Sequence, residues 1–134
     1  MNAVLTPSLC EQEVMSVEFP RADVFAEACP SRSVLTNVTS RWGVLVLISL
    51  SEGTLRYSQI RRKIGGVSEK MLAQTLQALE RDGFVLRVSM PVVPPHVEYS
   101  LTPIGREVCA HVKGLTDWIE ANLPAVMEAR GALS

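Results

Sequence analysis

The stretch VSEKMLAQTLQALERDG, residues 67–83, decides the fold that we expect for this chain. Ser68 is a suitable helix N-cap because its hydroxyl can accept a backbone N–H of the first turn. Gly83 can adopt the left-handed conformation in which many helices end. Between them three leucines recur at helical spacing and predict an apolar face directed at a core. These are Leu72, Leu76 and Leu79.

The opposite face of this predicted helix carries short, amide-bearing or charged side chains, namely Glu69, Lys70, Ala73, Gln74 and Gln77. Amide groups can pair with the edges of bases in the major groove. Two interpretations follow from the helix alone: the recognition helix of a winged helix-turn-helix, or an ordinary amphipathic surface helix, which is a common element. The flanking sequence has to decide between them.

The preceding segment, SQIRRKI at residues 58–64, predicts a short helix with two isoleucines inward and three basic residues outward. Gly65 and Gly66 then break the helix. A short helix, a glycine turn and a capped second helix are the order of a helix-turn-helix. We expect the basic side chains to contact the phosphate backbone while the second helix enters the major groove. They are Arg61, Arg62 and Lys63.

Upstream of this motif the sequence predicts two further helices. Cys29-Pro30 begins a short amphipathic helix that ends near Thr39, because proline is favoured in the first turn of a helix. Ser40 can cap the next helix, which is apolar on most sides as far as Leu50 and is therefore typical of a buried central helix. Residues 1–22 predict a loose arm, and 22–28 one or two helical turns.

After Gly83 the apolar period changes from 3.6 to two, which predicts strands at residues 85–90 and 96–101 joined by a proline-rich loop. Neighbouring strands of this kind favour an antiparallel hairpin, here a wing. Leu86, Val88 and Met90 would form the half-buried face of the first strand. We expect Arg87 and His96 near the tip to touch phosphate or the minor groove. Alternatively, Arg87 pairs with Glu98 across the strands.

Thr102-Pro103 predicts the start of a last helix whose apolar stripe runs for about twenty residues. The stripe is either a core face or a dimer interface, and we favour the interface because doubling gives a DNA reader a palindromic site. Pro124 should bend or restart the helix, with Asn122 as a candidate cap. The predicted interface residues are Val108, Val112, Leu115, Trp118, Ile119 and Leu123.

Composition and charge bound the function. The 134 residues suffice for one domain with a core, and the formal net charge is −1. Residues 1–28 sum to −4 and residues 53–90 to +4, so the positive charge surrounds the predicted recognition helix, as in many DNA-binding proteins. No nucleophile–base set, phosphate-binding glycine loop or metal-ligand motif predicts an enzyme. Three cysteines without paired spacing argue against a disulfide framework and a zinc site.

Three blocks together resemble the HxlR family of bacterial winged helix-turn-helix regulators, and most closely its QorR-type subgroup. They are CPSRSVLTNVTSRWGVLVLISL, GTLRYSQIRRKIGGVSEKMLAQTLQALERDGFVLR and VPPHVEYSLTPIGREV, and the resemblance covers residues 29–127. It implies a homodimeric transcription factor, usually a repressor, with dimerisation through terminal helices. In several members the cysteine that aligns with Cys29 senses oxidants or electrophilic quinones.

Cys29 also has local features that bear on sensing. A thiol at a helix N-terminus lies at the positive end of the dipole, which lowers its pKa, and Arg32 one turn later should add to this effect. The alternative is a buried structural cysteine with a raised pKa. Cys10 and Cys109 are weaker candidates, and Cys109 is expected to pack in the core.

The sequence thus predicts a mainly α protein with a small β-hairpin, an α+β winged helix-turn-helix with N- and C-terminal dimerisation helices. Residues 1–28 would form an arm, 29–127 the DNA-binding domain and 128–134 a tail. We expect a cytoplasmic bacterial regulator, associated with the nucleoid when it binds a palindromic DNA operator, without a cofactor or metal. The alternative is a winged-helix module that binds protein. The predicted DNA-binding residues are Arg56, Ser58, Arg61, Arg62, Lys63, Ser68, Glu69, Lys70, Ala73, Gln74, Gln77, Arg87 and His96.

Overall fold

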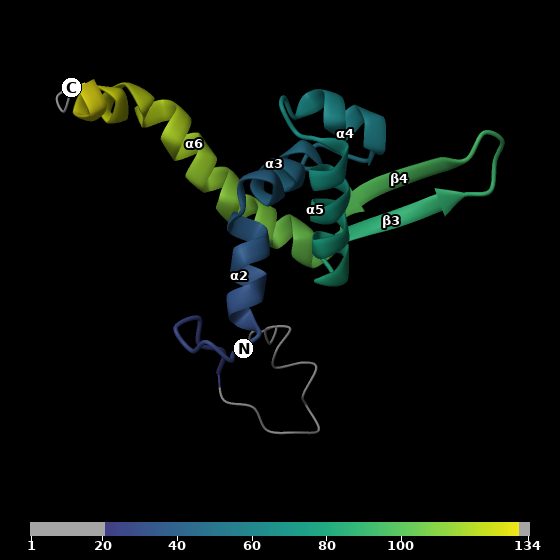
Figure 1. Cartoon of the computed structure of the whole chain (residues 1–134), viewed down its shortest axis with the longest axis horizontal. Helices are drawn as coiled ribbons and strands as arrows, with labels where there is room; N and C mark the ends of the chain where they lie inside the picture. The colour runs from purple at the N-terminus through teal and green to yellow at the C-terminus, as the bar shows by residue number, and fades with distance from the viewer. Residues whose placement is uncertain (1–20, 132–134) are drawn as a thin grey trace. The chain divides into compact units, whose positions relative to one another are not determined.

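The computed structural model describes residues 21–131, and the predicted arm and tail lie largely outside them. Within these residues four shorter helices and a three-stranded sheet precede a long last helix (Figure 1). Their bounds are α2 Ser31–Thr39, α3 Arg41–Ser49, β2 Leu55–Arg56, α4 Tyr57–Lys63, α5 Glu69–Arg81, β3 Val85–Met90, β4 His96–Leu101 and α6 Pro103–Gly131. The predicted class, mainly α with a small β-hairpin, is confirmed, and β2 adds a third strand to that hairpin.

The chain divides into two compact units, one ending at Asn37 and one beginning at Val38. In the first unit, the segment before α2 forms hydrogen-bonded turns, in which Ala26 N–H donates to the Asp23 carbonyl and Cys29 N–H to the Ala26 carbonyl. Residues 22–28 therefore form the one or two turns predicted there as separate hydrogen-bonded turns, without α-helix. Alpha-helix begins only at Ser31, directly after Pro30.

The core of the second unit is formed where α3 contacts α5 and α6. Its most deeply buried side chains are Val46, Leu47, Ile60, Leu72 and Leu79. Each such aliphatic side chain contributes about 1.5–3 kcal/mol when it leaves water. The three leucines predicted on the inner face of α5 are all buried, which confirms the predicted orientation of this helix.

Local capping sets the helix boundaries as the sequence predicts. The Ser40 hydroxyl accepts the Gly43 N–H at 3.0 Å and the Ser68 hydroxyl accepts the Met71 N–H at 3.1 Å. At the end of α5, Gly83 has φ +85°, a conformation that favours glycine. Thr102 caps α6 by accepting the Gly105 N–H at 3.0 Å, and its own hydroxyl donates to the Gly83 carbonyl at 2.6 Å.

The sheet has the strand order β2-β4-β3, and both pairings are antiparallel. The central strand β4 therefore joins a strand that precedes the helix-turn-helix to one that follows it. Beyond Val85, however, β3 is not half-buried: Leu86 and Val88 are 50% and 38% exposed. The predicted half-burial is wrong for Leu86 and Val88, because the hairpin extends past the helices that could cover it (Figure 1), whereas Met90 is partly buried.

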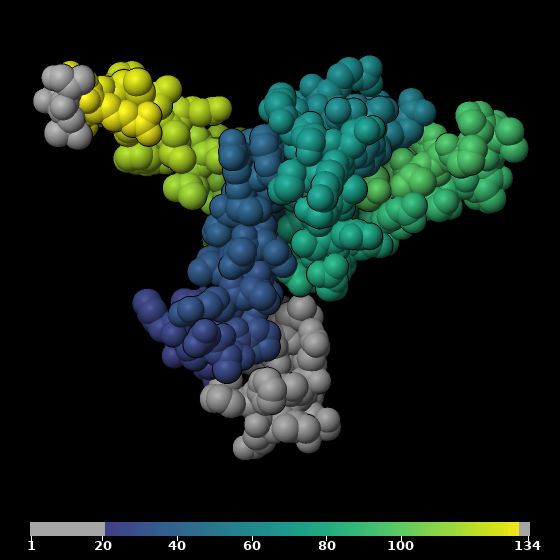
Figure 2. Space-filling model, in the orientation of Figure 1, coloured from purple at the N-terminus to yellow at the C-terminus, as the bar shows by residue number. Residues whose placement is uncertain are grey.

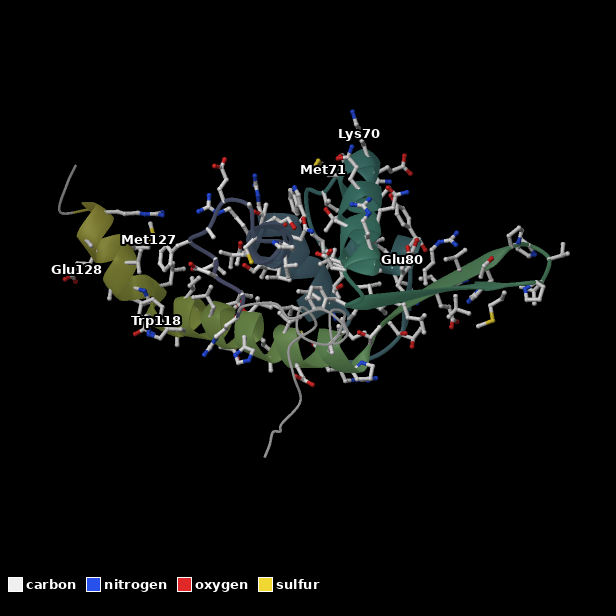
Figure 3. All side chains as sticks on the ribbon, turned by 90° about the horizontal axis from the view of Figure 1, so that it is seen from below. Lys70, Met71, Glu80, Trp118, Met127 and Glu128 are labelled. Carbon is white, nitrogen blue, oxygen red and sulfur yellow. The ribbon has the colours of Figure 1, made fainter. Side chains whose placement is uncertain are left out.

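Helix α6 passes through Pro124 without restarting and ends at Gly131. Asn122 is not a cap, because its side-chain amide donates to the Trp118 carbonyl at 2.8 Å within the same helix. Figures 1 and 3 show the last part of α6 running in a different direction from its first part, as expected for a proline that removes one backbone hydrogen bond. None of the helices within residues 21–131 has the length and apolar character needed to cross a bilayer.

Candidate nucleic-acid interface

The outer face of α5 presents the predicted polar set to solvent. Lys70, Ala73, Gln74 and Gln77 are exposed, whereas the hydroxyl of Ser68 is engaged as the N-cap. Figure 3 shows Lys70 at one end of α5, pointing away from the other elements of this unit, with Glu80 towards the other end. The same end exposes Met71 (40%), which sequence analysis did not single out. A thioether there can contact the methyl group of thymine.

Helix α4 places its three basic side chains on the surface, as predicted. Two of them are partly neutralised: Arg61 forms an ion pair with Glu69 at 3.3 Å, and Lys63 forms one with Glu52 at 3.8 Å. Arg62 forms no ion pair with any residue between 21 and 131. It is therefore the basic group of α4 most available to a phosphate.

Tyr57 links the two helices of the motif, a role that sequence analysis missed. Its hydroxyl donates to the Glu69 backbone carbonyl at 2.8 Å. Burial, and next the charge of Glu69, raise the pKa of Tyr57 above its ordinary value, so the hydroxyl remains a donor. With Ser58, Arg61, Arg62 and Glu69, this tyrosine lines a shallow hollow of about 400 Å³ between α4 and α5.

Arg56 lies in β2 at the start of α4. Its backbone N–H donates to the Gln59 side-chain oxygen at 2.8 Å, which satisfies a donor at the helix N-terminus. Its side chain is exposed, and Arg56 lies opposite Glu98 in the sheet. Arg56 is therefore placed where β2, α4 and the hairpin meet.

The hairpin differs from the prediction in two respects. Arg87 lies opposite Tyr99, in the middle of β3 and not near the tip, and Val88 is the residue opposite Glu98. The alternative Arg87–Glu98 pair is not formed either, since Glu98 instead contacts the His96 Nε2 at 2.8 Å. His96 does lie beside the tip, paired with Met90. Figure 2 shows the hairpin (green) extending beyond α5 (teal).

Cys29 lies in the first unit, one residue before Pro30, and is partly exposed. The Ser31 hydroxyl donates to its Sγ at 3.0 Å, and this bond is the main reason that the pKa of the thiol lies below its ordinary value. Backbone hydrogen bonds at Asp23 and Ser31 lower it further, while burial and the Asp23 charge oppose them. Arg32 does not assist as predicted, because its guanidinium donates to the carbonyls of Val24 and Phe25.

Cys109 is a core residue, as expected. Its thiol donates to the Leu47 carbonyl at 3.3 Å, and burial raises its pKa. Cys10 lies outside the described residues. Within residues 21–131 no three histidine, cysteine or acidic side chains come together as metal ligands would.

The predicted interface residues on α6 separate into two groups. Val112 is buried in the core of the second unit and is therefore not available as predicted, whereas Val108 is only partly buried. The remaining four are 43–57% exposed: Leu115, Trp118, Ile119 and Leu123. Figure 3 shows Trp118, one of these four, on the part of α6 that extends away from the other elements of the second unit.

Comparison with known proteins identifies close relatives of this chain. A model of the HxlR-like helix-turn-helix family matches residues 37–127. The HTH-type transcriptional regulator YtfH of Escherichia coli strain K12 is 63% identical over 119 residues, 89% of this chain and 94% of that protein. The solved structure of YtfH from Salmonella typhimurium is 66% identical, with a TM-score of 0.79, and the match covers 82% of this chain and 98% of that chain.

A more distant solved structure is the redox regulator HypR in its oxidised form. It is 34% identical, with a TM-score of 0.65, over 70% of this chain and 97% of that chain. These matches confirm the winged helix-turn-helix fold and exclude the enzyme class, and they favour a DNA-binding regulator over a module that binds only protein. The QorR-type subgroup remains a prediction.

Proposed function

The chain belongs to the HxlR family of helix-turn-helix transcriptional regulators, and from this premise we propose that it acts as a homodimeric repressor on a palindromic operator. In each subunit α5 enters the major groove, and α4, with the hairpin, contacts the flanking phosphates. The protein is cytoplasmic and associates with the nucleoid when it binds its operator. We assign residues 29–127 as the DNA-binding domain, and its last helix continues to Gly131.

One observation carries the DNA-binding mode. The face of α5 opposite its buried leucines exposes Lys70, Gln74 and Gln77, and Arg62 of the neighbouring helix lies unpaired among residues 21–131. Amides and ammonium groups can donate to base edges, while a guanidinium suits a phosphate. The two kinds of group therefore occupy the elements in which a helix-turn-helix needs them.

Support for the dimer comes from the outer half of α6. Leu115, Trp118, Ile119 and Leu123 leave a large apolar surface in water on one helix. Isolated exposed apolar residues are normal, but a continuous apolar stripe indicates a protein interface. A second copy of α6 would cover it, and two-fold symmetry would then match the two half-sites of a palindrome.

A charged substitution in the stripe tests the dimer. We expect Ile119→Asp to sediment as a monomer and to lose DNA binding by at least about tenfold, because each monomer then holds only one half-site. Ala110→Asp is the matched control: it adds the same charge to an exposed position on the opposite side of α6. Analytical ultracentrifugation and fluorescence anisotropy on the upstream DNA measure both quantities. If the Ile119→Asp protein remains a dimer, the dimer interface does not lie on this stripe of α6.

The response to redox or electrophile stress is proposed for Cys29. A lowered pKa increases the fraction of Cys29 present as thiolate, which is the form that reacts with electrophiles, and the side chain is partly exposed. HypR, a structural relative, is a redox regulator. We expect diamide or a quinone to release wild-type protein from DNA and to leave Cys29→Ser bound, in a mobility-shift titration. Equal release of both proteins would remove Cys29 from the mechanism.

A further inference from the structure

Glu69 is unusual for a residue at the DNA-reading end of the motif. It is the only acidic residue between Gly53 and Leu79, and it is the first residue of α5. Its side chain is 72% exposed. A carboxylate in this position repels phosphates, so its presence requires a physical account.

Two contacts fix the position of Glu69. The Arg61 Nη1 lies 3.3 Å from its Oε1, and the Tyr57 hydroxyl donates to its backbone carbonyl at 2.8 Å. The positive end of the α5 dipole also favours a carboxylate at the first helical residue. The negative charge is thus compensated before DNA arrives, and its repulsion of the backbone is reduced.

The Arg61–Glu69 pair contributes little to folding. Its two side chains are 46% and 72% exposed, and ion pairs of this kind stabilise proteins only slightly because water screens them. The contact is better explained by orientation. It engages one carboxylate oxygen, and no other residue between 21 and 131 donates to the second, so Oε2 remains an acceptor at the groove-facing end of α5.

We infer that Glu69 determines sequence specificity by accepting a hydrogen bond from the exocyclic amine of a cytosine, and that Arg61 is the residue that positions its carboxylate. Among the groups on the floor of the major groove, the cytosine and adenine amines are donors, and carboxylates pair with the cytosine amine. This inference rests on the proposed function, since α5 has to enter the groove. It gives two neighbouring residues of α4 different roles: Arg61 positions a carboxylate that reads a base, and Arg62 contacts a phosphate.

The test is a selection of binding sites by the full-length protein from a randomised double-stranded DNA library, followed by affinities for duplexes that carry each base pair at the selected position. We expect wild type to prefer cytosine at one position of each half-site. Glu69→Gln should lose about tenfold of that preference, or transfer it to adenine, which glutamine pairs with. The remaining positions of the site should be unchanged.

Arg61 and Arg62 give the matched comparison. Arg61→Ala should lose the cytosine preference while other positions keep theirs, and Arg61→Lys should restore part of it by returning the positive charge. Arg62→Ala should weaken binding to all sequences alike, because a phosphate contact carries no base information. Thermal unfolding of each variant establishes that it is folded.

Three results would overturn the inference. One is an unchanged cytosine preference in Glu69→Gln; another is a uniform loss in Arg61→Ala that matches Arg62→Ala, which would make Arg61 a phosphate contact. The third is a wild-type protein that selects a site but shows no cytosine preference. In all three cases the proposed function survives. If wild type selects no sequence at all, the proposed function fails as well.

Discussion

The reactivity of Cys29 depends on one neighbouring hydroxyl. The sequence suggested that Arg32 would lower the pKa of the thiol, but the guanidinium is committed to two backbone carbonyls, and the Ser31 hydroxyl provides the main effect. A hydrogen bond to sulfur is stronger when the sulfur is negative, so it favours the thiolate. At a given pH below the ordinary pKa, a larger fraction of Cys29 is therefore reactive.

Alkylation of native protein by iodoacetamide, followed by peptide mass spectrometry at several pH values, measures this effect. The rate at Cys29 should rise with pH and reach half its maximum below the pH typical of a free cysteine. Ser31→Ala should move that midpoint upwards. Cys109, whose pKa is raised by burial, should react slowly in the same samples.

Ser33→Ala is the matched control for this experiment, since the Ser33 hydroxyl donates to the Pro30 carbonyl and not to sulfur. Its profile should coincide with that of wild type. If Ser31→Ala also coincides with wild type, the hydroxyl does not control the thiol.

Among single residues, those with local roles could be predicted from the sequence. Ser68 and Gly83 act within one turn of their own helix, so the pattern around them was sufficient. The partners of Glu69 could not be predicted in the same way, because Arg61 and Tyr57 lie on another helix. Only the packing angle of α4 on α5 determines whether those side chains meet.

At the scale of elements, every helix from α2 to α6 was predicted near its observed bounds, because the apolar period, the caps and the glycines that set those bounds are local features of the sequence. The failures concern burial. The alternation in β3 correctly predicted a strand but not which of its faces would be covered, because a hairpin can extend beyond the core. Likewise, Val112 belongs to the same stripe as Leu115, yet Val112 is buried and Leu115 is exposed.

A close approach between elements was also beyond the sequence. Gly105, in the first turn of α6, lies against Phe84: a Cβ there would overlap the Phe84 carbonyl oxygen and lie 2.9 Å from its carbon. Gly105→Ala should therefore destabilise the protein by about 3 kcal/mol, since backbone must move. Thermal unfolding should show a midpoint roughly 10 °C lower.

Gly65→Ala serves as the control for Gly105→Ala. A Cβ at Gly65 would meet nothing within 4 Å, and no left-handed backbone is required there. Its unfolding free energy should stay within about 0.5 kcal/mol of wild type. A Gly105→Ala protein as stable as Gly65→Ala would show that α6 can move away from Phe84 without cost.

For the whole molecule, charge distribution matters more than net charge. A formal charge of −1 conceals +4 over residues 53–90, so affinity for DNA should fall steeply with salt as counterions return to the phosphates. Arg62→Gln should reduce the slope of log affinity against log salt by about 2 in the dimer, one phosphate contact from each subunit.

The control for this measurement is Lys113→Gln, which removes the same charge from α6, where Lys113 pairs with Asp117 at 3.1 Å. Its slope should equal that of wild type. An Arg62→Gln slope indistinguishable from the Lys113→Gln slope would exclude Arg62 from the phosphate contacts.

The strand order β2-β4-β3 has a consequence for how regulators of this kind can diverge. Strand β4 pairs with the strands on both sides of the helix-turn-helix, since β2 directly precedes α4 and β3 directly follows α5. The loop at residues 91–95 lies beyond the paired strands and is exposed. Insertions or deletions in that loop change how far the hairpin extends along the duplex, while the pairing of β4 with β2 and β3 is kept. The length of the hairpin and the base contacts of α5 can therefore evolve independently.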